Sequence, residues 1–209
     1  MSKPVKRRSY TSALRKEQAA LTRRLIVDAA AQLFLSSGYA RTTIKDIASG
    51  AGVAADTIYA VFGTKARVLT AVLDARLQAS IIDSAQPLGV RDETDQRRQL
   101  SMFARDMTAI SAQVRPIFEV LRTAAAVEPE VGQLFAEFEQ NRLANMKIAA
   151  KWIARRGRLK LSQDRAAEIM WAVASHDIGR MLCDVQGWSQ AQHAKWLEST
   201  LTSALLESV

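Results

Sequence analysis

The stretch Thr42–Lys65 constrains the fold of this chain more than any other part, because it predicts two short helices joined by a tight turn. Thr43 and Asp46 have the spacing of a capping box, which begins a helix. Gly52 can adopt the left-handed backbone that ends it, and a second helix is expected over Ala55–Val61. Helices this short are not stable alone. The pattern therefore predicts a helix-turn-helix docked on a third helix, a motif whose second helix enters the DNA major groove.

The third helix is expected directly before this stretch, from about Ser12 to Ser36, with Gly38 as its stop. An apolar stripe at helical spacing marks the side that faces the helix-turn-helix. The stripe consists of Leu21, Leu25, Ile26, Ala29, Ala30, Leu33 and Phe34. Leu33 and Phe34 are expected to pack on Ile47, Val53, Ile58 and Phe62.

Several parts of this stretch resemble the DNA-binding signature of the tetracycline-repressor (TetR) family. They are Thr42-Thr43, Asp46-Ile47-Ala48, Ala51-Gly52-Val53, Thr57-Ile58-Tyr59, Phe62 and Thr64-Lys65. A spaced pattern of this length is far more specific than a lone glycine motif. The resemblance implies an all-α homodimer with a small DNA-binding domain and a larger C-terminal domain. It also implies that a small molecule bound in the second domain releases the DNA.

The positive charge of the chain is concentrated near its N-terminus. The net charge is +8 at pH 7, and residues 1–24 hold eight Lys or Arg and one Glu. Residues 71–209 hold seventeen charges of each sign and are neutral as a whole. A basic segment beside a helix-turn-helix indicates a phosphate backbone as the partner. The alternative is a solvated tail that aids solubility.

Cysteine content and hydropathy indicate where the protein works. The single cysteine, Cys183, excludes an internal disulfide and fits a reducing cytoplasm. No apolar run follows the basic N-terminus as in a signal peptide, and none approaches the roughly 20 residues that span a bilayer. We therefore expect a cytoplasmic protein with no membrane partner.

The chain divides into three expected parts: a flexible basic arm (1–12), a helix-turn-helix DNA-binding domain (13–65) and a ligand-binding and dimerisation domain (66–209). Helices of the last part are expected at about 65–85, 95–110, 113–127, 129–156, 163–185 and 190–207, with a polar loop at 86–93. Pro116 is expected in the first turn of its helix. The whole chain is thus expected to be an all-α, nine-helix TetR-like fold.

Reactive side chains do not converge in the pattern of an enzyme. His176 and Cys183 are expected about 10.5 Å apart along one helix, too far for a hydrogen bond. No pair of residues recurs at zinc-ligand spacing, and no glycine-rich phosphate loop is present. We expect no catalytic residue, no cofactor and no metal.

The resemblance assigns DNA contacts to specific positions of this sequence. Threonine hydroxyls at the start of the first short helix would contact phosphates, and Lys45 could reach a base edge or a phosphate. The exposed side of the second helix would face the DNA, with Tyr59 reaching its backbone. The assigned residues are Thr42, Thr43, Lys45, Ala55, Asp56, Thr57, Tyr59, Ala60 and Lys65, to which the basic arm adds Arg7 and Arg8.

The second helix departs from the family pattern in ways that weaken direct readout. Ala54 stands where a Ser or Thr cap is common, a loss of about 1 kcal/mol. Residues 55–61 contain no Lys or Arg, so no guanidinium can grip guanine there. Thr57 can still contact a thymine methyl group, and Asp56 can accept from cytosine. Much of the phosphate affinity must therefore come from elsewhere, and the basic arm is the expected source.

The last two helices are expected to pair with their symmetry mates in the dimer. A glycine in mid-helix costs about 1 kcal/mol, which a close helix approach would explain. The expected interface residues are Ala172, Ser175, Gly179, Leu197 and Leu201. The alternative for these residues is packing within one chain.

The middle helices offer apolar side chains for a ligand cavity. Asn141 and Asn145 interrupt the apolar stripe of their helix and would suit the polar anchors of such a cavity. The alternative is a helix–helix hydrogen bond or an exposed edge. The expected ligand-binding residues are Phe103, Met107, Phe118, Leu121, Phe138, Asn141, Asn145 and Trp171.

These observations predict a ligand-responsive transcriptional regulator, a repressor, that binds a pseudo-palindromic operator in double-stranded DNA as a homodimer. The predicted effector is a small molecule that favours a conformer whose two DNA-binding heads no longer match the half-site spacing. The alternative is a helical protein-interaction module whose DNA-binding head has decayed. The sequence carries no indication of the effector, the operator or the regulated genes.

Overall fold

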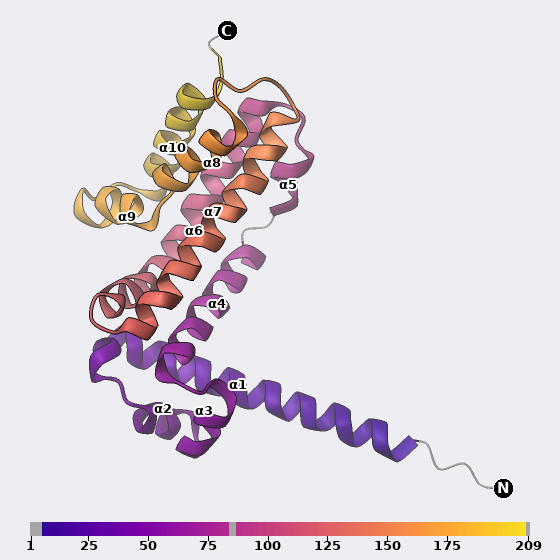
Figure 1. The fold of residues 1–209 in the computed structure, drawn as a ribbon, viewed down its shortest axis with the longest axis vertical. Helices are drawn as coiled ribbons and strands as arrows, with labels where there is room; N and C mark the ends of the chain where they lie inside the picture. The colour runs from indigo at the N-terminus through magenta and orange to yellow at the C-terminus, as the bar shows by residue number, and fades with distance from the viewer. Residues whose placement is uncertain (1–5, 84–86, 208–209) are drawn as a thin grey trace, which may run out of the picture. The chain divides into compact units, whose positions relative to one another are not determined.

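The computed structural model describes residues 6–83 and 87–207, and side-chain environments over residues 14–80 and 89–207. The described residues form helices and turns with no β-strand (Figure 1). None of these helices has the length and apolar character needed to cross a membrane. The all-α fold class predicted from the sequence is confirmed. The chain separates into two units, residues 1–72 and 73–209, each with its own packing. The boundary between the two units lies after Val72, whereas the sequence analysis expected the DNA-binding domain to end at Lys65.

The N-terminal unit consists of α1 (Lys6–Arg41), α2 (Ile44–Ala51), α3 (Ala55–Phe62) and the first turns of α4 (Lys65–Asp83). Gly38, with φ 75° and ψ 169°, interrupts α1 as the sequence predicted. Residues 6–12, expected to belong to a flexible arm, have helical backbone.

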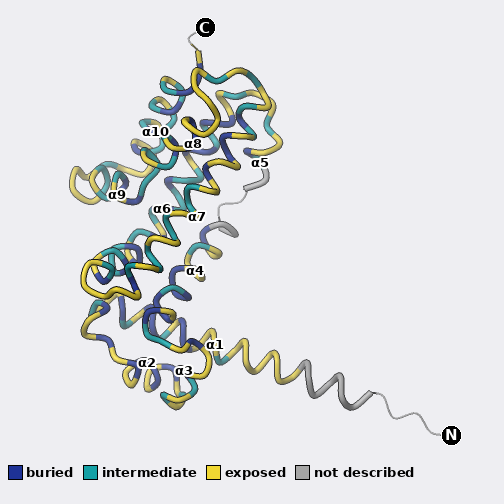
Figure 2. The backbone as a smooth tube through the Cα atoms, in the orientation of Figure 1, coloured by how far each residue is buried: buried dark blue, intermediate teal, exposed yellow. Residues whose placement is uncertain are grey.

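Burial in this unit begins halfway along α1 (Figure 2). Ile26, Phe34, Ile47 and Ile58 are at most 1 % exposed and form the centre of its core, whereas Leu21 is 58 % and Leu25 44 % exposed. The apolar stripe predicted for α1 is therefore wrong at its N-terminal end. Helix α2 packs on α1, and the buried side chains of α1 begin at Ile26.

The C-terminal unit is built around the pair α6 (Gln96–Ala125) and α7 (Pro129–Ala154), which run side by side (Figure 1). The short α5 (Pro87–Asp92) packs on both helices. Helix α8 (Gln163–Val173) packs on α7, and α10 (Gln190–Leu205) packs on α6. Between them lie α9 (His176–Gly179) and the π-helical segment η1 (Arg180–Val185). Their shared core includes Leu100, Ile153, Met170, Leu197, Leu201 and Leu205, all fully buried.

Two boundaries in this unit differ from the sequence prediction because packing overrides a local signal. Pro116 lies inside α6, and the helix continues through it instead of starting there. The buried Val114, Ile117 and Phe118 hold both sides of the proline in one helix and offset the backbone hydrogen bond that proline cannot make. The segment 86–93, expected to be a loop, contains α5. Val90 of this helix is buried, and its backbone carbonyl accepts a hydrogen bond from the side chain of Gln99 at 2.9 Å.

The prediction of one continuous helix over 163–185 is also wrong, because α8 ends at Val173 and a break at Ala174 and Ser175 separates it from α9. The hydroxyl of Ser175 accepts a hydrogen bond from the backbone N–H of Ile178 and caps the short α9. A serine in this role competes with the helix that precedes it. The break brings His176 out of the α8 register and sets it against the cavities of this unit.

Candidate DNA-binding surface and ligand cavities

Helix α2 begins with the capping box that the sequence predicted. The Thr43 hydroxyl accepts from the Asp46 backbone N–H at 3.2 Å, and the Asp46 carboxylate accepts from the Thr43 N–H at 3.0 Å. The Thr43 hydroxyl also donates to Asp46 Oδ2 at 2.7 Å, and this hydrogen bond, followed by the one from the Thr43 backbone N–H, lowers the pKa of Asp46. Thr43 and Lys45 are exposed and available to a DNA phosphate.

Thr42, the other threonine assigned to a phosphate, has a different position. Its side chain is 2 % exposed, and its hydroxyl donates to the Gly38 carbonyl at 2.8 Å. The hydroxyl thereby caps the end of α1 where Gly38 interrupts it. In the free protein Thr42 joins α1 to α2 and does not present its hydroxyl at the surface.

One side of helix α3 packs in the core of the N-terminal unit, and the other side is exposed to solvent. Ile58 and Phe62 are buried beneath it, while Asp56, Tyr59 and Ala60 are exposed, Tyr59 by 52 %. Ala55 and Thr57 are partly exposed. Ala54 precedes the helix and makes no side-chain cap hydrogen bond, as its methyl group requires. The exposed side of α3 is the side that the sequence analysis assigned to DNA.

Lys65 contacts its own chain. Its ammonium donates to the backbone carbonyls of Tyr39 at 2.9 Å and Thr42 at 3.0 Å, and lies 4.0 Å from the centre of the Tyr39 ring. This lysine therefore holds the start of α4 to the corner between α1 and α2. Binding of a DNA phosphate would compete with these contacts.

The basic arm is described only in part. Arg7 and Arg8 lie in α1, and their side-chain positions are outside the described residues, as are residues 1–5. Further along α1, the guanidinium of Arg23 lies over the Phe62 ring, 4.5 Å from its centre. The contribution of Arg7 and Arg8 to phosphate binding stays a prediction.

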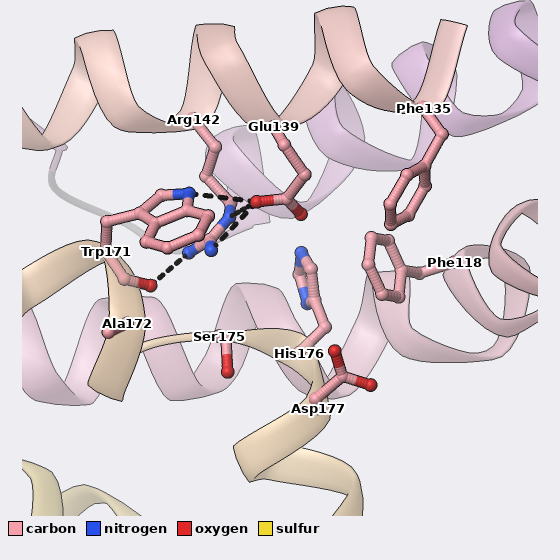
Figure 3. Close-up of a pocket in the computed structure, with 9 residues that line it drawn as sticks. All are labelled: Phe118, Phe135, Glu139, Arg142, Trp171, Ala172, Ser175, His176 and Asp177. Carbon is pink, nitrogen blue, oxygen red and sulfur yellow. Dashed lines mark hydrogen bonds and ion pairs between the residues drawn. The ribbon is translucent and has the colours of Figure 1, made fainter. Parts of the chain in front are cut away.

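The part of the C-terminal unit that the structure describes contains cavities, of which three concern the predicted ligand site. The first, of about 380 Å³, lies between α6, α7 and the break after α8 (Figure 3). It is lined by Phe118, Phe135, Glu139, Arg142, Trp171, Ala172, Ser175, His176 and Asp177. The second, of about 240 Å³, shares Arg142 and His176 with the first, and the third, of about 410 Å³, shares Met107, Asn145 and Met146 with the second.

Most residues predicted to bind ligand line one of these cavities. Phe118 and Trp171 line the first, and Phe103 and Met107 line the third. Leu121 lines none of the three and is 1 % exposed in the core. The remaining members, Phe138, Asn141 and Asn145, line the second cavity, and the two asparagines are exposed at its edge.

The charged residues of the first cavity were missed by the sequence analysis. Arg142 and Glu139 form an ion pair in which both guanidinium nitrogens Nε and Nη2 approach Glu139 Oε2, at 3.1 and 3.0 Å. Trp171 Nε1 donates to the same oxygen at 2.9 Å. The spacing of Glu139 and Arg142 along α7 is that of a helical ion pair, which is usually at the surface. Only 11 % of the Arg142 side chain and 21 % of the Glu139 side chain are exposed.

His176 is the second residue that the sequence analysis left without a role. Its Nδ1 lies 3.2 Å from the Ser111 hydroxyl, and its ring lies 4.4 Å from that of Phe118. Burial, and then the nearby positive charges of Arg142 and Arg115, lower the pKa of His176 to about 4. The imidazole is therefore neutral at physiological pH and can bind a ligand only as a hydrogen-bonding or stacking group.

Three of the predicted dimer residues are instead used within one chain. Leu197 and Leu201 are fully buried in the core of the C-terminal unit. A Cβ atom on Gly179 would lie 3.1 Å from both Ser111 Oγ and Arg115 Nη1, so a larger residue requires these side chains of the same chain to shift. Their burial favours the alternative of packing within one chain, and a role at a partner's surface stays a prediction. Ser175 caps α9, and Ala172 is exposed.

Cys183 lies close to an imidazole, but not the one considered in the sequence analysis. Its Sγ is 3.7 Å from Nδ1 of His193, a residue of α10 that is 3 % exposed. Burial, and then the nearby Arg115, lower the pKa of His193. Within the described ranges no three His, Cys, Asp or Glu residues gather in a way that could hold a metal ion.

Comparisons with known proteins agree with this geometry. Residues 26–72, the core of the N-terminal unit, match the family described as "Bacterial regulatory proteins, tetR family". The chain is 31 % identical over 190 residues to a probable HTH-type transcriptional regulator, ArpR, of Pseudomonas putida, covering 83 % of this chain and 90 % of that protein. It is 30 % identical, with the same coverage, to the HTH-type transcriptional regulator TtgR, also of Pseudomonas putida.

Solved structures share the fold. NalD of Pseudomonas aeruginosa, described as the secondary repressor of the MexAB-OprM multidrug efflux pump, aligns with a TM-score of 0.66 at 20 % identity. The alignment covers 91 % of this chain and all of NalD. SmeT in complex with triclosan aligns with a TM-score of 0.69 at 18 % identity, over 90 % of this chain and 92 % of SmeT.

The helix-turn-helix geometry and the relatives that match nearly the whole chain lead to the same result. The described relatives are transcriptional regulators and not enzymes. This chain belongs to the TetR family and is a DNA-binding transcriptional regulator.

Proposed function

We propose that a homodimer of this chain binds a pseudo-palindromic operator in double-stranded DNA and represses transcription until a small molecule binds the C-terminal unit. The observation that supports the DNA-binding part of this proposal is the exposure of one side of α3. Its inner residues Ile58 and Phe62 are buried, and Asp56, Tyr59 and Ala60 are left at the surface. A helix held in this way can enter the major groove without unfolding its support. Because chromosomal DNA is its target, the protein would act in the cytoplasm.

Dimerisation is supported by the geometry of operator recognition. Two helix-turn-helix units on one two-fold axis read half-sites spaced by a helical turn of DNA, about 34–36 Å, or a multiple of it. The interface would use the exposed sides of α8 and α10, of which Ala172 is one member, since Leu197 and Leu201 are buried. Sedimentation at equilibrium tests this part, and a monomer at micromolar concentration would contradict it.

The cavities of the C-terminal unit support an effector site. Each combines an apolar lining with a few polar groups, as ligand sites do, and the first lies within the usual volume range of about 300–1,000 Å³. A protein of similar fold points the same way, because SmeT was solved with triclosan bound.

Binding of the DNA upstream of this protein's own gene tests the proposed function. Fluorescence anisotropy of a labelled duplex should show saturable binding that weakens steeply as salt rises, because phosphate contacts release counterions. A helical protein-interaction module with a decayed DNA-binding head would bind this duplex no better than a shuffled sequence.

A further inference from the structure

Arg142 occupies an enclosed position beside the first cavity, which we call the cation cage. The cage consists of the Glu139 carboxylate and the ring and backbone carbonyl of Trp171 (Figure 3), together with the backbone carbonyl of Ala174. The Arg142 guanidinium lies 5.0 Å from the centre of the Trp171 ring. Its Nη1 donates to the Trp171 carbonyl at 2.8 Å and lies 3.5 Å from that of Ala174.

The chemistry of the cage is that of a site for an organic cation. A carboxylate supplies charge-assisted hydrogen bonds, and an indole ring supplies cation–π attraction. The two carbonyls belong to the C-terminal end of α8, where the helix dipole is negative. All these groups favour a positive charge. Two nitrogens of Arg142 and Nε1 of Trp171 donate to Oε2 of Glu139, and the Trp171 hydrogen bond still orients the carboxylate when Arg142 leaves.

The cage opens onto space that an aromatic molecule can fill. Phe118 and Phe135 line the opposite side of the first cavity, and the second carboxylate oxygen of Glu139 lies on the side of His176 (Figure 3). The neutral His176 adds no repulsion toward a cation. Arg142 itself borders both the first and the second cavity. A flexible side chain at this boundary can leave the cage without disturbing the helix that carries it.

We propose that the first cavity binds an aromatic organic cation, such as an arylguanidinium or a protonated arylamine, and that Arg142 occupies its cation subsite in the ligand-free protein. The ligand places its charged group in the cation cage and its ring against Phe118 and Phe135. Arg142 moves out as the ligand enters, so that the charge inside the cage is replaced and not doubled.

This exchange deepens the proposed function and rests on it for its regulatory meaning. When Arg142 leaves, the carbonyls of Trp171 and Ala174 lose their donor immediately before the break that starts α9. The ligand must replace these hydrogen bonds in its own geometry. A difference in that geometry would shift the helices that follow Ala174 and thereby the population that binds DNA.

Binding of a matched pair of small molecules tests the proposal. Phenylguanidinium copies the Arg142 head group and carries an aromatic ring, and phenylurea has nearly the same shape without the charge. Isothermal titration should show that the wild-type protein prefers phenylguanidinium. Arg142→Met should strengthen phenylguanidinium binding by about 10-fold, because the internal competitor is gone, and change phenylurea binding by less than about 3-fold.

Control variants separate a charge effect from an opened hole. Adding Glu139→Gln to Arg142→Met should abolish the gain. Arg165→Met should leave both affinities unchanged, because Arg165 and Glu168 form the same kind of pair on the exposed side of α8. If Arg142→Met does not fold, Arg142→Lys should give a gain of about 3-fold in the same direction, because an ammonium cannot make all the guanidinium's contacts. Equal gains for both probes, or no gain for either, would overturn the proposal.

A second readout keeps this inference distinct from the proposed function. The operator affinity of the wild-type protein is measured with and without saturating phenylguanidinium. Cation-selective binding that leaves operator affinity unchanged would retain the cage and refute effector release through it. Operator release caused equally by phenylurea would retain an effector-responsive regulator and refute the cation subsite.

Discussion

The two units of this protein differ in how far local sequence determines their structure. In the N-terminal unit, the local signals in the sequence agree with the structure: a capping box begins α2, a left-handed glycine ends it, and the apolar positions of α2 and α3 are buried. The C-terminal unit follows packing that overrides local signals, since α6 passes through Pro116 and the helix over 163–185 breaks at Ser175. Function is divided in the same way: one unit carries a recognisable motif, and the other carries cavities whose polar groups have no motif.

The largest expected effect separates the two units. Phe34 is fully buried and stacks on Tyr39 with ring centres 5.8 Å apart. Phe34→Ala should lower the free energy of unfolding of the N-terminal unit by about 3–5 kcal/mol and abolish operator binding, while ligand binding to the C-terminal unit persists. Thermal unfolding measures the change in stability, and fluorescence anisotropy of a labelled operator duplex measures the loss of DNA binding. The exposed neighbour Leu35→Ala should change stability by less than about 0.5 kcal/mol, and equal effects of both variants would contradict the assignment.

The second expected effect concerns the basic start of α1. Replacing Arg7 and Arg8 by Gln should weaken DNA binding without changing the choice of sequence, because phosphate contacts carry no sequence information. If both arginines of each subunit neutralise a phosphate, the slope of log K against log salt for the dimer becomes shallower by roughly 3.6. Salt titrations of both proteins measure this, and identical slopes would show that the segment is a solvated tail.

The third expected effect tests why α9 ends in a glycine. Gly179→Leu should destabilise the C-terminal unit by about 1–3 kcal/mol, because the new side chain meets Ser111 and Arg115. The variant should stay dimeric in sedimentation wherever it is folded. Ala144→Leu, on the exposed side of α7, should leave unfolding unchanged. Monomers of Gly179→Leu with wild-type stability would place the glycine at the dimer interface instead.

The smallest expected effect lies at the capping box. Thr43→Ala should cost about 1 kcal/mol, and Thr43→Ser should restore most of it. Because the pKa of Asp46 is lowered in the folded protein, its contribution is present above its ordinary pKa and is lost as the pH falls through the lowered value. Acid unfolding of the Thr43→Ala variant should therefore depend less on pH in that range, and an unchanged pH profile would remove this role.

The success of the sequence prediction follows the range over which each signal acts. Thr43, Gly52 and Gly38 act on residues within one turn, and the structure confirms all three boundaries. Leu21 and Leu25 continue the same apolar spacing but are exposed, because α2 and α3 are too short to cover them. Periodicity identifies a face of a helix and cannot say how far a partner extends along it.

The cavity residues show the opposite limit. Phe118, Trp171 and Asn141 were found from an apolar stripe and its interruptions, and each lines a cavity. Arg142 and Glu139 were missed because an ion pair three residues apart normally lies in solvent. Their burial depends on Trp171, near the end of α8, and on the break that follows this helix. Both features belong to a different helix from the ion pair, so the local sequence around Glu139 and Arg142 does not reveal them. A charged pair within an otherwise apolar stripe was the available signal.

Lys65 shows that a family resemblance can identify a residue and leave its role open. The resemblance assigned it to a phosphate, and its ammonium donates to two backbone carbonyls at the end of α1 and the start of α2. Both roles require a cation, so the residue type alone cannot distinguish them. The contacts within the chain account for a lysine in the first turn of α4, where the helix dipole disfavours positive charge.

The central claim is that this chain recognises a specific DNA sequence through α3. The most direct measurement compares its binding to the duplex upstream of its own gene with binding to a shuffled duplex of the same length and composition, in one salt concentration. The account predicts a preference of about 1,000-fold or more, and a loss of most of it when Asp56 and Thr57 are replaced by Ala. Equal affinity for the two duplexes would contradict sequence recognition and leave only the electrostatic attraction of a basic protein to DNA.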